Sequence, residues 1–309
     1  MYNFNFKSVV ELTQTFNTEE KCRKYVAEQR WKGKPCCPYC NYDEKIYILK
    51  SNNRYKCKSC KKQFTETVGT IFHGTRISLM SWFYVIYLFG SHKKGISAMQ
   101  ISKDINVTYK TAWFLLHRVR QMMREREGKL SGEVEIDETF VGGKNKNRHW
   151  NKRVKGNQGR ALIDKSAVYG FVERGGRVRT LHIKKLNGKG MQLLLTKFVT
   201  KDSSIYSDEY KNYNGLDNRF KEHNVVNHGR GQYVDGDNHT NTIESFWSGL
   251  KKGIIAIYHS VSKHKLFRYC YEFEFRWNTR SKSQFECFEN LLENSFSQRL
   301  TWKKLVERR

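Results

Sequence analysis

Residues 37–60 read CPYCNYDEKIYILKSNNRYKCKSC, and this stretch decides the fold of the first part of the chain. It begins and ends with a Cys-x-x-Cys pair, Cys37 with Cys40 and Cys57 with Cys60, and 16 residues lie between the pairs. Each pair forms a tight turn that directs two thiolates at one ion, so that two such turns complete a tetrahedral Zn²⁺ site. Cys36 is an alternative to Cys37 at a less suitable spacing. The stretch predicts a zinc ribbon, whose metal stabilises a module too small for a core of its own.

The residues on either side extend this predicted module. Asn17 followed by Glu20 resembles a capping box and predicts a helix that runs to about Trp31. Short strands are expected at 45–49, 53–57 and 62–65. Basic side chains are dense here and favour contact with DNA, while a purely architectural or dimerising ribbon is the alternative. They are Lys32, Lys34, Arg54, Lys56, Lys58, Lys61 and Lys62.

The whole chain is strongly basic. Its 309 residues contain 57 Lys and Arg against 30 Asp and Glu, which gives a formal net charge of +27. Such a balance is typical of proteins that bind polyanions, because Lys and Arg neutralise phosphates and release condensed counterions. We therefore expect a nucleic-acid partner rather than a merely soluble surface. We expect no membrane association, since no apolar run approaches the roughly 20 residues of a membrane span.

The remaining cysteines and the N-terminal residues indicate the cellular compartment. Cys22, Cys36, Cys270 and Cys287 are scattered, which fits a reducing compartment without disulfides. Residues 1–14 contain no signal-peptide core. We expect a cytoplasmic protein that is associated with the nucleoid.

Residues 78–127 show a helical period, with three apolar sets that predict three helices. Within them, residues 96–113 have the pattern of a helix, a tight turn and a second helix, with Ser97 and Thr108 as caps and Asn106 in the turn. The second helix would present its N-terminal end to base edges. The residues predicted to contact DNA are Tyr109, Lys110 and Thr111 at that end and Arg118 further along, where His117 and Arg120 could also reach phosphates. A three-helix bundle that serves only as a spacer is the alternative.

After Gly132 strands dominate the chain. They are expected at 133–137, 166–172 and 177–183, the last two joined by a hairpin turn at Gly175-Gly176. A helix at 188–200, strands at 204–208 and near 224–226, and long helices at about 240–256 and 262–279 follow. Three antiparallel strands followed by helix, strand, helix, strand and helix is the element order of a ribonuclease-H-like fold.

These patterns predict an α+β or α/β multidomain chain with three parts. Residues 1–70 form an N-terminal helix and a four-cysteine zinc ribbon, and residues 71–130 form an all-α helix-turn-helix domain. Residues 131–309 form a ribonuclease-H-like mixed sheet with flanking and C-terminal helices.

Three acidic residues stand where this fold builds a divalent-metal site. Asp137 and Asp208 are each expected at the end of a strand, and Glu244 in the first turns of a helix. Phosphodiester cleavage needs neutralised charge, an activated nucleophile and a stabilised leaving oxygen, which two Mg²⁺ ions about 3.5–4 Å apart provide. Carboxylates suit Mg²⁺, or Mn²⁺ in its place, because these ions prefer oxygen ligands. Other acidic residues close to these in the sequence are alternative metal ligands. They are Glu138, Glu209, Asp235 and Asp237.

The chain resembles the bacterial insertion-sequence transposases that carry a zinc ribbon, a helix-turn-helix and an Asp-Asp-Glu catalytic domain. The resemblance runs from about residue 15 to 281 and rests on several motifs taken together. They are CPYC at 37–40, the pair at 57–60, GISA at 95–98, EIDETFVGG at 135–143, SDEY at 207–210, HTNTIESFW at 239–247, KKG at 251–253, YH at 258–259 and RWNTR at 276–280. It implies excision and integration of a mobile element by a multimer on the element's ends, with Asp137, Asp208 and Glu244 as catalytic metal ligands.

Two further basic features are predicted to contact DNA. Lys251 lies on the same helix face as Glu244 and could hold a phosphate nearby. The loop between Gly143 and Ala161 contains no acid and leaves from the strand of Asp137, so we expect it to clamp DNA; a solvated charge run is the alternative. Its predicted contacts are Lys144, Lys146, Arg148, Lys152 and Arg153.

The sequence therefore predicts a DNA transposase that binds the ends of a mobile element and catalyses metal-dependent cleavage and strand transfer. The expected cofactors are structural Zn²⁺ and two catalytic Mg²⁺ or Mn²⁺ ions. The expected partners are double-stranded DNA, as element ends and target, and further copies of the chain in a dimer or higher multimer. Two alternatives stay open: a catalytically inactive zinc-ribbon and helix-turn-helix regulator, and a metal-dependent nuclease without strand transfer.

Overall fold

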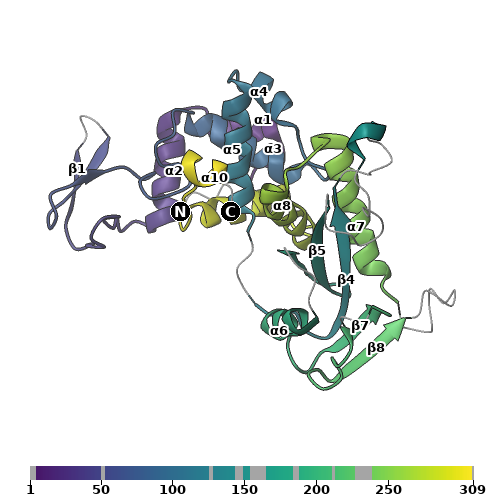
Figure 1. The fold of residues 1–309 in the computed structure, drawn as a ribbon. Coiled ribbons are helices and arrows are strands. Elements are labelled where there is room, and N and C mark those ends of the chain that lie inside the picture. Colours follow the sequence, from purple (N-terminus) through teal and green to yellow (C-terminus); the bar gives the residue numbers. More distant parts are fainter. Residues whose placement is uncertain are drawn as a thin grey trace. The chain divides into compact units, whose positions relative to one another are not determined.

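The computed structural model describes residues 5–49, 53–124, 128–142, 149–153, 165–183, 188–210, 213–226 and 239–307. The chain forms two compact units (Figure 1). The first comprises Met1–Met123 and Ser281–Arg308, and the second comprises Arg124–Arg280. Among the helices in the described ranges, none is long and apolar enough to cross a membrane.

The first unit begins with two helices and a small sheet. α1 (Val9–Thr15) and α2 (Glu19–Trp31) precede β1 (Ile46–Leu49), β2 (Arg54–Cys57) and β3 (Gln63–Phe64), which pair antiparallel in the order β1-β2-β3. Thr18 caps α2 by accepting a hydrogen bond from the backbone N–H of Lys21, one residue after the predicted cap Asn17. The sequence pattern does not predict α1, which buries only Leu12.

Three helices follow in this unit and confirm the predicted helix-turn-helix. They are α3 (Leu79–Ser91), α4 (Ala98–Asp104) and α5 (Tyr109–Met122). The side chain of Ser97 caps α4, and that of Thr108 caps α5, each by accepting a backbone N–H of the first turn. Asn106 takes a φ of +49° in the turn between them, a conformation that Asn tolerates better than most residues.

The last two helices also belong to the first unit, although the predicted 131–309 domain includes them. They are α9 (Gln284–Ser295) and α10 (Trp302–Val306). α9 packs on α3, where the ring of Phe288 lies 5.2 Å from the rings of both Phe6 and Phe83, and Leu291 is fully buried. This aromatic core joins parts of the chain that are far apart in sequence, so local patterns do not reveal it.

The second unit is built on a five-stranded mixed sheet. Its strands are β4 (Glu133–Val141), β5 (Ser166–Glu173), β6 (Val178–Ile183), β7 (Ser204–Asp208) and β8 (Glu222–Val226), in the order β6-β5-β4-β7-β8. β4, β5 and β6 pair antiparallel, whereas β7 pairs parallel with both β4 and β8. This arrangement fits the predicted ribonuclease-H-like sheet.

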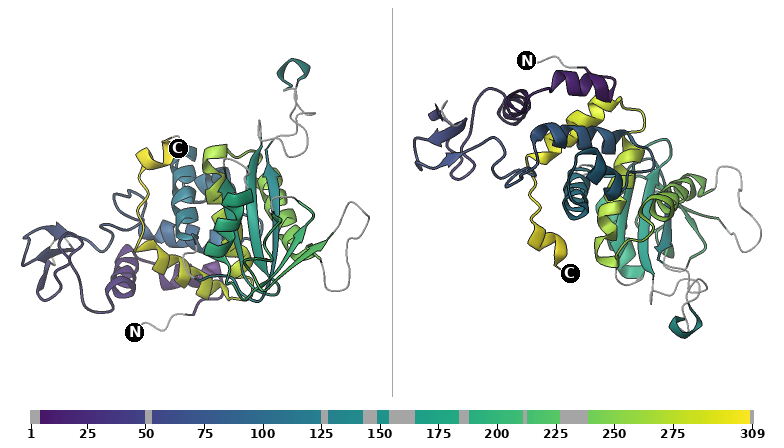
Figure 2. Two further views of the ribbon diagram at one scale, coloured as in Figure 1. Left: turned by 60° about the horizontal axis from the view of Figure 1, so that its bottom comes forward. Right: turned by 90° about the horizontal axis from the view of Figure 1, so that it is seen from above.

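Helices cover both faces of this sheet (Figure 2). On one face α6 (Gly188–Phe198) packs on Ile136, Tyr169 and Phe171. On the other face α7 (Asn241–Gly253) and α8 (Leu266–Asn278) pack on Val168 and Val172. Alternate residues of β4 and β5 therefore face opposite helical layers, as the two-residue period of a strand requires.

Three predicted element bounds need correction. β4 runs on to Val141, so Asp137 is its middle residue rather than its end. The described residues between β7 and β8 contain turns and a 3₁₀-helical residue, Tyr213, but no α-helix, where the expected element order has a helix. α7 ends at Gly253 and continues as a π-helical turn, Ile254–Tyr258.

Candidate functional site

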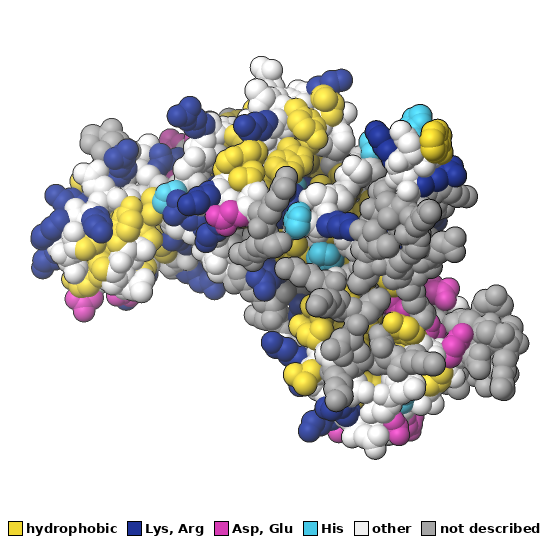
Figure 3. Space-filling view, in the orientation of Figure 1, with side chains coloured by type: hydrophobic (Ala, Val, Ile, Leu, Met, Phe, Trp, Pro, Cys, Tyr) yellow, Lys and Arg dark blue, Asp and Glu magenta, His cyan; other side chains and the backbone are white. Residues whose placement is uncertain are grey.

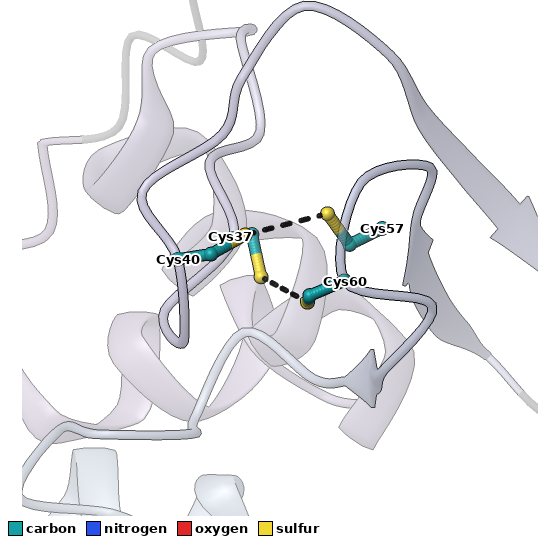
Figure 4. Close-up of side chains that lie close together, drawn as sticks. All are labelled: Cys37, Cys40, Cys57 and Cys60. Carbon is teal, nitrogen blue, oxygen red and sulfur yellow. Dashed lines mark hydrogen bonds between the residues drawn. The ribbon is translucent and has the colours of Figure 1, made fainter.

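The four predicted zinc ligands lie together (Figure 4). The Sγ atoms of Cys37, Cys40, Cys57 and Cys60 all lie within 4.8 Å of one another, and Cys36 is outside this group. The Cys37–Cys60 and Cys40–Cys57 sulfur pairs are each 3.6 Å apart. A tetrahedral zinc ion with bonds of about 2.3 Å holds its sulfur ligands about 3.8 Å apart. The four thiols therefore fit one structural zinc ion.

Local backbone geometry forms this cluster. The carbonyl of Cys37 accepts the N–H of Asn41, and the carbonyl of Cys57 accepts the N–H of Lys61. Asn41 and Lys61 take φ values of +57° and +61°, so both turns close in the same way. Without metal, burial raises the pKa of Cys37 to about 12, and a backbone N–H of Tyr42 lowers the pKa of Cys40 to about 7. A bound cation favours the thiolate form of all four.

Replacement of one ligand should remove the zinc. Cys57 is fully buried in the cluster, so we expect Cys57→Ser to lose bound zinc and to unfold the ribbon around Phe64. Cys36→Ser is the matched control and should keep one zinc ion per chain. Metal content measured by mass spectrometry on the purified proteins tests this, and loss of zinc from the Cys36 variant would contradict the ligand assignment.

The predicted DNA-reading end of α5 is accessible. Tyr109 is 53% exposed and Lys110 is exposed, whereas Thr111 is half-buried and its backbone N–H donates to the cap Thr108. Basic side chains also surround the ribbon (Figure 3), with Lys58, Lys61 and Lys62 exposed.

Arg118 does not have the exposure that its predicted phosphate contact needs. It is 5% exposed, its guanidinium donates to the carbonyl of His73, and it lies 5.0 Å from the ring of Trp82. Burial lowers its pKa to about 10. His117 and Arg120 are buried as well. The structure gives Arg118 a role in the core of the first unit, in place of the predicted contact with DNA.

Asp137 and Asp208 lie on the same face of the sheet. β4 pairs with β7 in parallel through Glu135 and Tyr206, so the same register two residues further sets Asp137 opposite Asp208, the last residue of β7. Ile136 and Ile205 point to the α6 face, which turns the two aspartates toward the α7 face. The sheet therefore brings these two predicted ligands side by side.

Contacts from α7 and β5 define the setting of Asp137. Its Oδ2 accepts the indole N–H of Trp247 at 3.0 Å, and its Oδ1 accepts the N–H of Glu138 at 2.7 Å. A Cβ at Gly170, its partner on β5, would lie 2.5 Å from the Trp247 ring, so only glycine admits the indole there. Burial, together with the charges of Glu138 and Asp208, raises the pKa of Asp137 to about 7.

The alternative acidic ligands do not lie beside Asp137 on the α7 face of the sheet in the part of the chain that the structure describes. Glu138 points to the other face of the sheet, where it accepts the hydroxyl of the buried Tyr213 at 2.6 Å. Glu209 is exposed next to Asp208, whose Oδ1 accepts the N–H of Tyr210. Asp235 and Asp237 lie outside the described residues.

Glu244 lies in the first turn of α7 and is exposed. Among the described residues only the four cysteines form a group of three or more metal-binding side chains whose ligand atoms all lie within 4.8 Å of one another, so Asp137, Asp208 and Glu244 do not form such a compact group. Glu244 stands one turn before Trp247, which contacts Asp137. Lys251 is exposed in the last turn of the same helix.

Glu135 is a residue of this region that the sequence interpretation missed. It is fully buried on β4, two residues before Asp137, and its carboxylate accepts the backbone N–H of Ile243 and the hydroxyl of Thr242. Arg174 donates to it at 3.0 Å. Thr240, at the start of α7, makes no side-chain cap. Glu135 therefore caps α7 from the neighbouring strand and fixes the helix that carries Glu244.

The RWNTR motif at 276–280 holds the β5–β6 hairpin. The side chain of Asn278 accepts the N–H of Val178 and donates to its carbonyl, on the edge strand β6. Arg280 and Trp277 donate to the carbonyls of the hairpin turn at Gly175 and Gly176. The motif has a structural role in covering a sheet edge.

The basic loop is described only in part. Lys144, Lys146 and Arg148 lie outside the described residues. Lys152 and Arg153 are exposed at the end of the 3₁₀ turn Trp150–Lys152, where Trp150 is 83% exposed.

Comparison with known proteins identifies the family. Residues 17–63 match the transposase zinc-ribbon domain, and residues 129–278 match the ISXO2-like transposase domain. The chain is 30% identical over 293 residues to an uncharacterized protein in transposable element ISH50 of Halobacterium salinarum, a match that covers 91% of this chain and 98% of that protein. An uncharacterized transposase-like protein of Haemophilus influenzae is 25% identical over 120 residues, or 38% of this chain and 96% of that protein. The chain therefore belongs to the insertion-sequence transposases, with a transposase zinc-ribbon domain and an ISXO2-like transposase domain.

Proposed function

We propose that this protein is a transposase that binds the ends of its own mobile element and catalyses metal-dependent DNA cleavage and strand transfer. The observation that carries the proposal is the pair Asp137 and Asp208 on one face of the sheet, beneath the helix that bears Glu244. Asp137, Asp208 and Glu244 would hold the catalytic divalent ions.

The chemistry of these side chains fits Mg²⁺ or Mn²⁺. All three ligands offer oxygen. Burial, together with the neighbouring charges of Glu138 and Asp208, raises the pKa of Asp137, and a bound cation would favour its carboxylate form. When bound, the ions neutralise charge on the transferring phosphoryl group and activate the attacking water or 3′-hydroxyl. Trp247 holds the orientation of the Asp137 carboxylate through its indole N–H. Lys251 is assigned to a DNA phosphate near Glu244.

DNA recognition is assigned to the first unit and to the basic loop. Tyr109 and Lys110 have the exposure that contact with base edges needs, and Thr111 follows them in the first turn of α5. Lys152 and Arg153 are exposed and are assigned to phosphates, together with Lys144, Lys146 and Arg148. A dimer or higher multimer on the two element ends completes the proposal.

A strand-transfer assay tests the reaction. The full chain is incubated with Mg²⁺, a supercoiled target plasmid and labelled duplexes that carry the DNA flanking its gene. Joined products support the transposase. Cleaved but unjoined ends would instead indicate a nuclease, and binding without either reaction would indicate a regulator.

The pKa of Asp137 predicts a pH dependence of metal binding. Because its folded pKa is about 7 against an ordinary value of 3.8, the metal-free protein should lose stability as the pH rises between these values. A cation must displace the proton, so Mg²⁺ affinity should rise about tenfold per pH unit below 7 and level off above it. Titration calorimetry from about pH 5.5 to 8 measures this. An affinity that does not change with pH, or an equal dependence in Asp137→Asn, would count against the assignment.

A further inference from the structure

The proposed DNA-reading helix α5 offers few exposed cations. Its basic residues are Lys110, Arg118 and Arg120, and of these Arg118 is 5% and Arg120 is 1% exposed. Arg120 lies over the ring of Phe89, at 5.2 Å from the centroid. Phosphate contacts fix the register of a recognition helix on DNA, so a helix with a single exposed cation needs them from elsewhere.

The segment 298–305 lies along this helix. Gln121, in the last turn of α5, donates to the side chain of Gln298 at 2.7 Å. Near the other end of α5, the ring of Trp302 lies 5.4 Å from that of Phe114, and the Nζ of Lys110 lies 4.9 Å from the Trp302 centroid. The segment therefore follows α5 from its last turn to its first.

Buried leucines attach the segment and leave its basic side chains outside. Leu300 and Leu305 are 4% and 3% exposed. Between and beside them Arg299, Lys303 and Lys304 are exposed, and residues 296–306 contain no Asp or Glu. Hydrophobic side chains with Lys and Arg beside them gather over α5 and α10 in Figure 3.

We propose that residues 298–305 form part of the DNA-binding surface of the helix-turn-helix. Trp302 holds Lys110 by a cation–π contact at the base-reading end of α5, and Arg299, Lys303 and Lys304 bind phosphates of double-stranded DNA. Because the exposed charged side chains of this segment are positive, the partner that fits this surface is the negatively charged backbone of double-stranded DNA. The inference rests on the proposed DNA recognition by α5.

The salt dependence of DNA binding tests this surface. The full chain, Lys303→Ala/Lys304→Ala and the control Lys21→Ala/Lys24→Ala, which removes the same charge from exposed positions on α2, are titrated with a duplex of about 30 base pairs from the element end. Loss of two phosphate contacts should reduce the slope of log affinity against log salt by about 1.8 and weaken binding at least about tenfold at about 0.1 M salt. The control should keep the wild-type slope.

The Trp302→Ala variant distinguishes two roles of the segment, which either binds DNA together with α5 or shields α5 from DNA. Trp302→Ala should weaken binding, because Lys110 loses its aromatic support. Tighter binding by Trp302→Ala would overturn the inference, since α10 would then shield α5. An unchanged slope in the Lys303/Lys304 variant, or equal slopes in this variant and the control, would overturn it too. A wild-type chain that fails to bind the duplex would remove the proposed DNA recognition as well, whereas wild-type binding with unaffected variants removes only the present inference.

Discussion

Asp137→Asn should slow strand transfer about a thousandfold while DNA binding remains. The substitution keeps the size of the side chain and an oxygen that can accept the indole N–H of Trp247, but it removes the negative charge that faces Asp208. Loss of about 4 kcal/mol of transition-state stabilisation lowers the rate about a thousandfold. The rate of end joining, measured with saturating duplex and Mg²⁺, gives this value directly.

Glu209→Gln is the matched control for that experiment. Glu209 follows Asp208 in the sequence and is exposed, so its charge should contribute little to the reaction. Retained joining in the Glu209 variant and its loss in Asp137→Asn support the ligand pair. Equal losses in both variants would indicate that general negative charge matters more than these positions, and joining by Asp137→Asn near the wild-type rate would remove Asp137 from the site.

Glu135→Ala should destabilise the second unit by about 3–5 kcal/mol, because it leaves the guanidinium of Arg174 without its buried partner and the first N–H groups of α7 without a cap. The free energy of unfolding from denaturant titration measures the loss. Glu135→Gln retains an acceptor for the backbone of Ile243, so its loss should be smaller.

Glu133→Ala is the control for Glu135→Ala, because it removes an ion pair with Arg174 but leaves the cap of α7 in place. Glu133 lies on the same strand and also contacts Arg174, at 3.1 Å, but its side chain is 52% exposed. Exposed pairs contribute at most about 1 kcal/mol, so this variant should unfold near the wild-type denaturant concentration. A positioning role for Glu135 further predicts that Glu135→Gln, while folded, loses strand transfer more than DNA binding. Equal stability of the Glu133 and Glu135 variants would contradict the capping role.

Short-range patterns predicted much of this molecule. The spacing of Cys37, Cys40, Cys57 and Cys60 was sufficient because each thiol pair is set by its own turn. Ser97 and Thr108 were identifiable as caps, since a cap depends on the next three residues.

Long-range contacts account for what the sequence did not reveal. Glu135 receives its partners Arg174 and Ile243 from 39 and 108 residues away, so a buried role is not visible in its own strand. Arg118 looks like a phosphate ligand on a helix diagram, but its ring partner Trp82 comes from α3. Asp137 was expected at a strand end, yet the strand continues to Val141, and the next side chain, Glu138, accepts a hydrogen bond from the hydroxyl of the distant Tyr213.

Anomalous diffraction from crystals of the full chain grown with Mn²⁺ and an element-end duplex would locate the catalytic ions. We expect an anomalous peak within carboxylate bonding distance of Asp137 and Asp208, on the α7 face of the sheet, and its loss in Asp137→Asn. A Mn²⁺ peak bound by Glu138 on the opposite face, or well-ordered aspartates without a peak beside them, would contradict this ligand assignment.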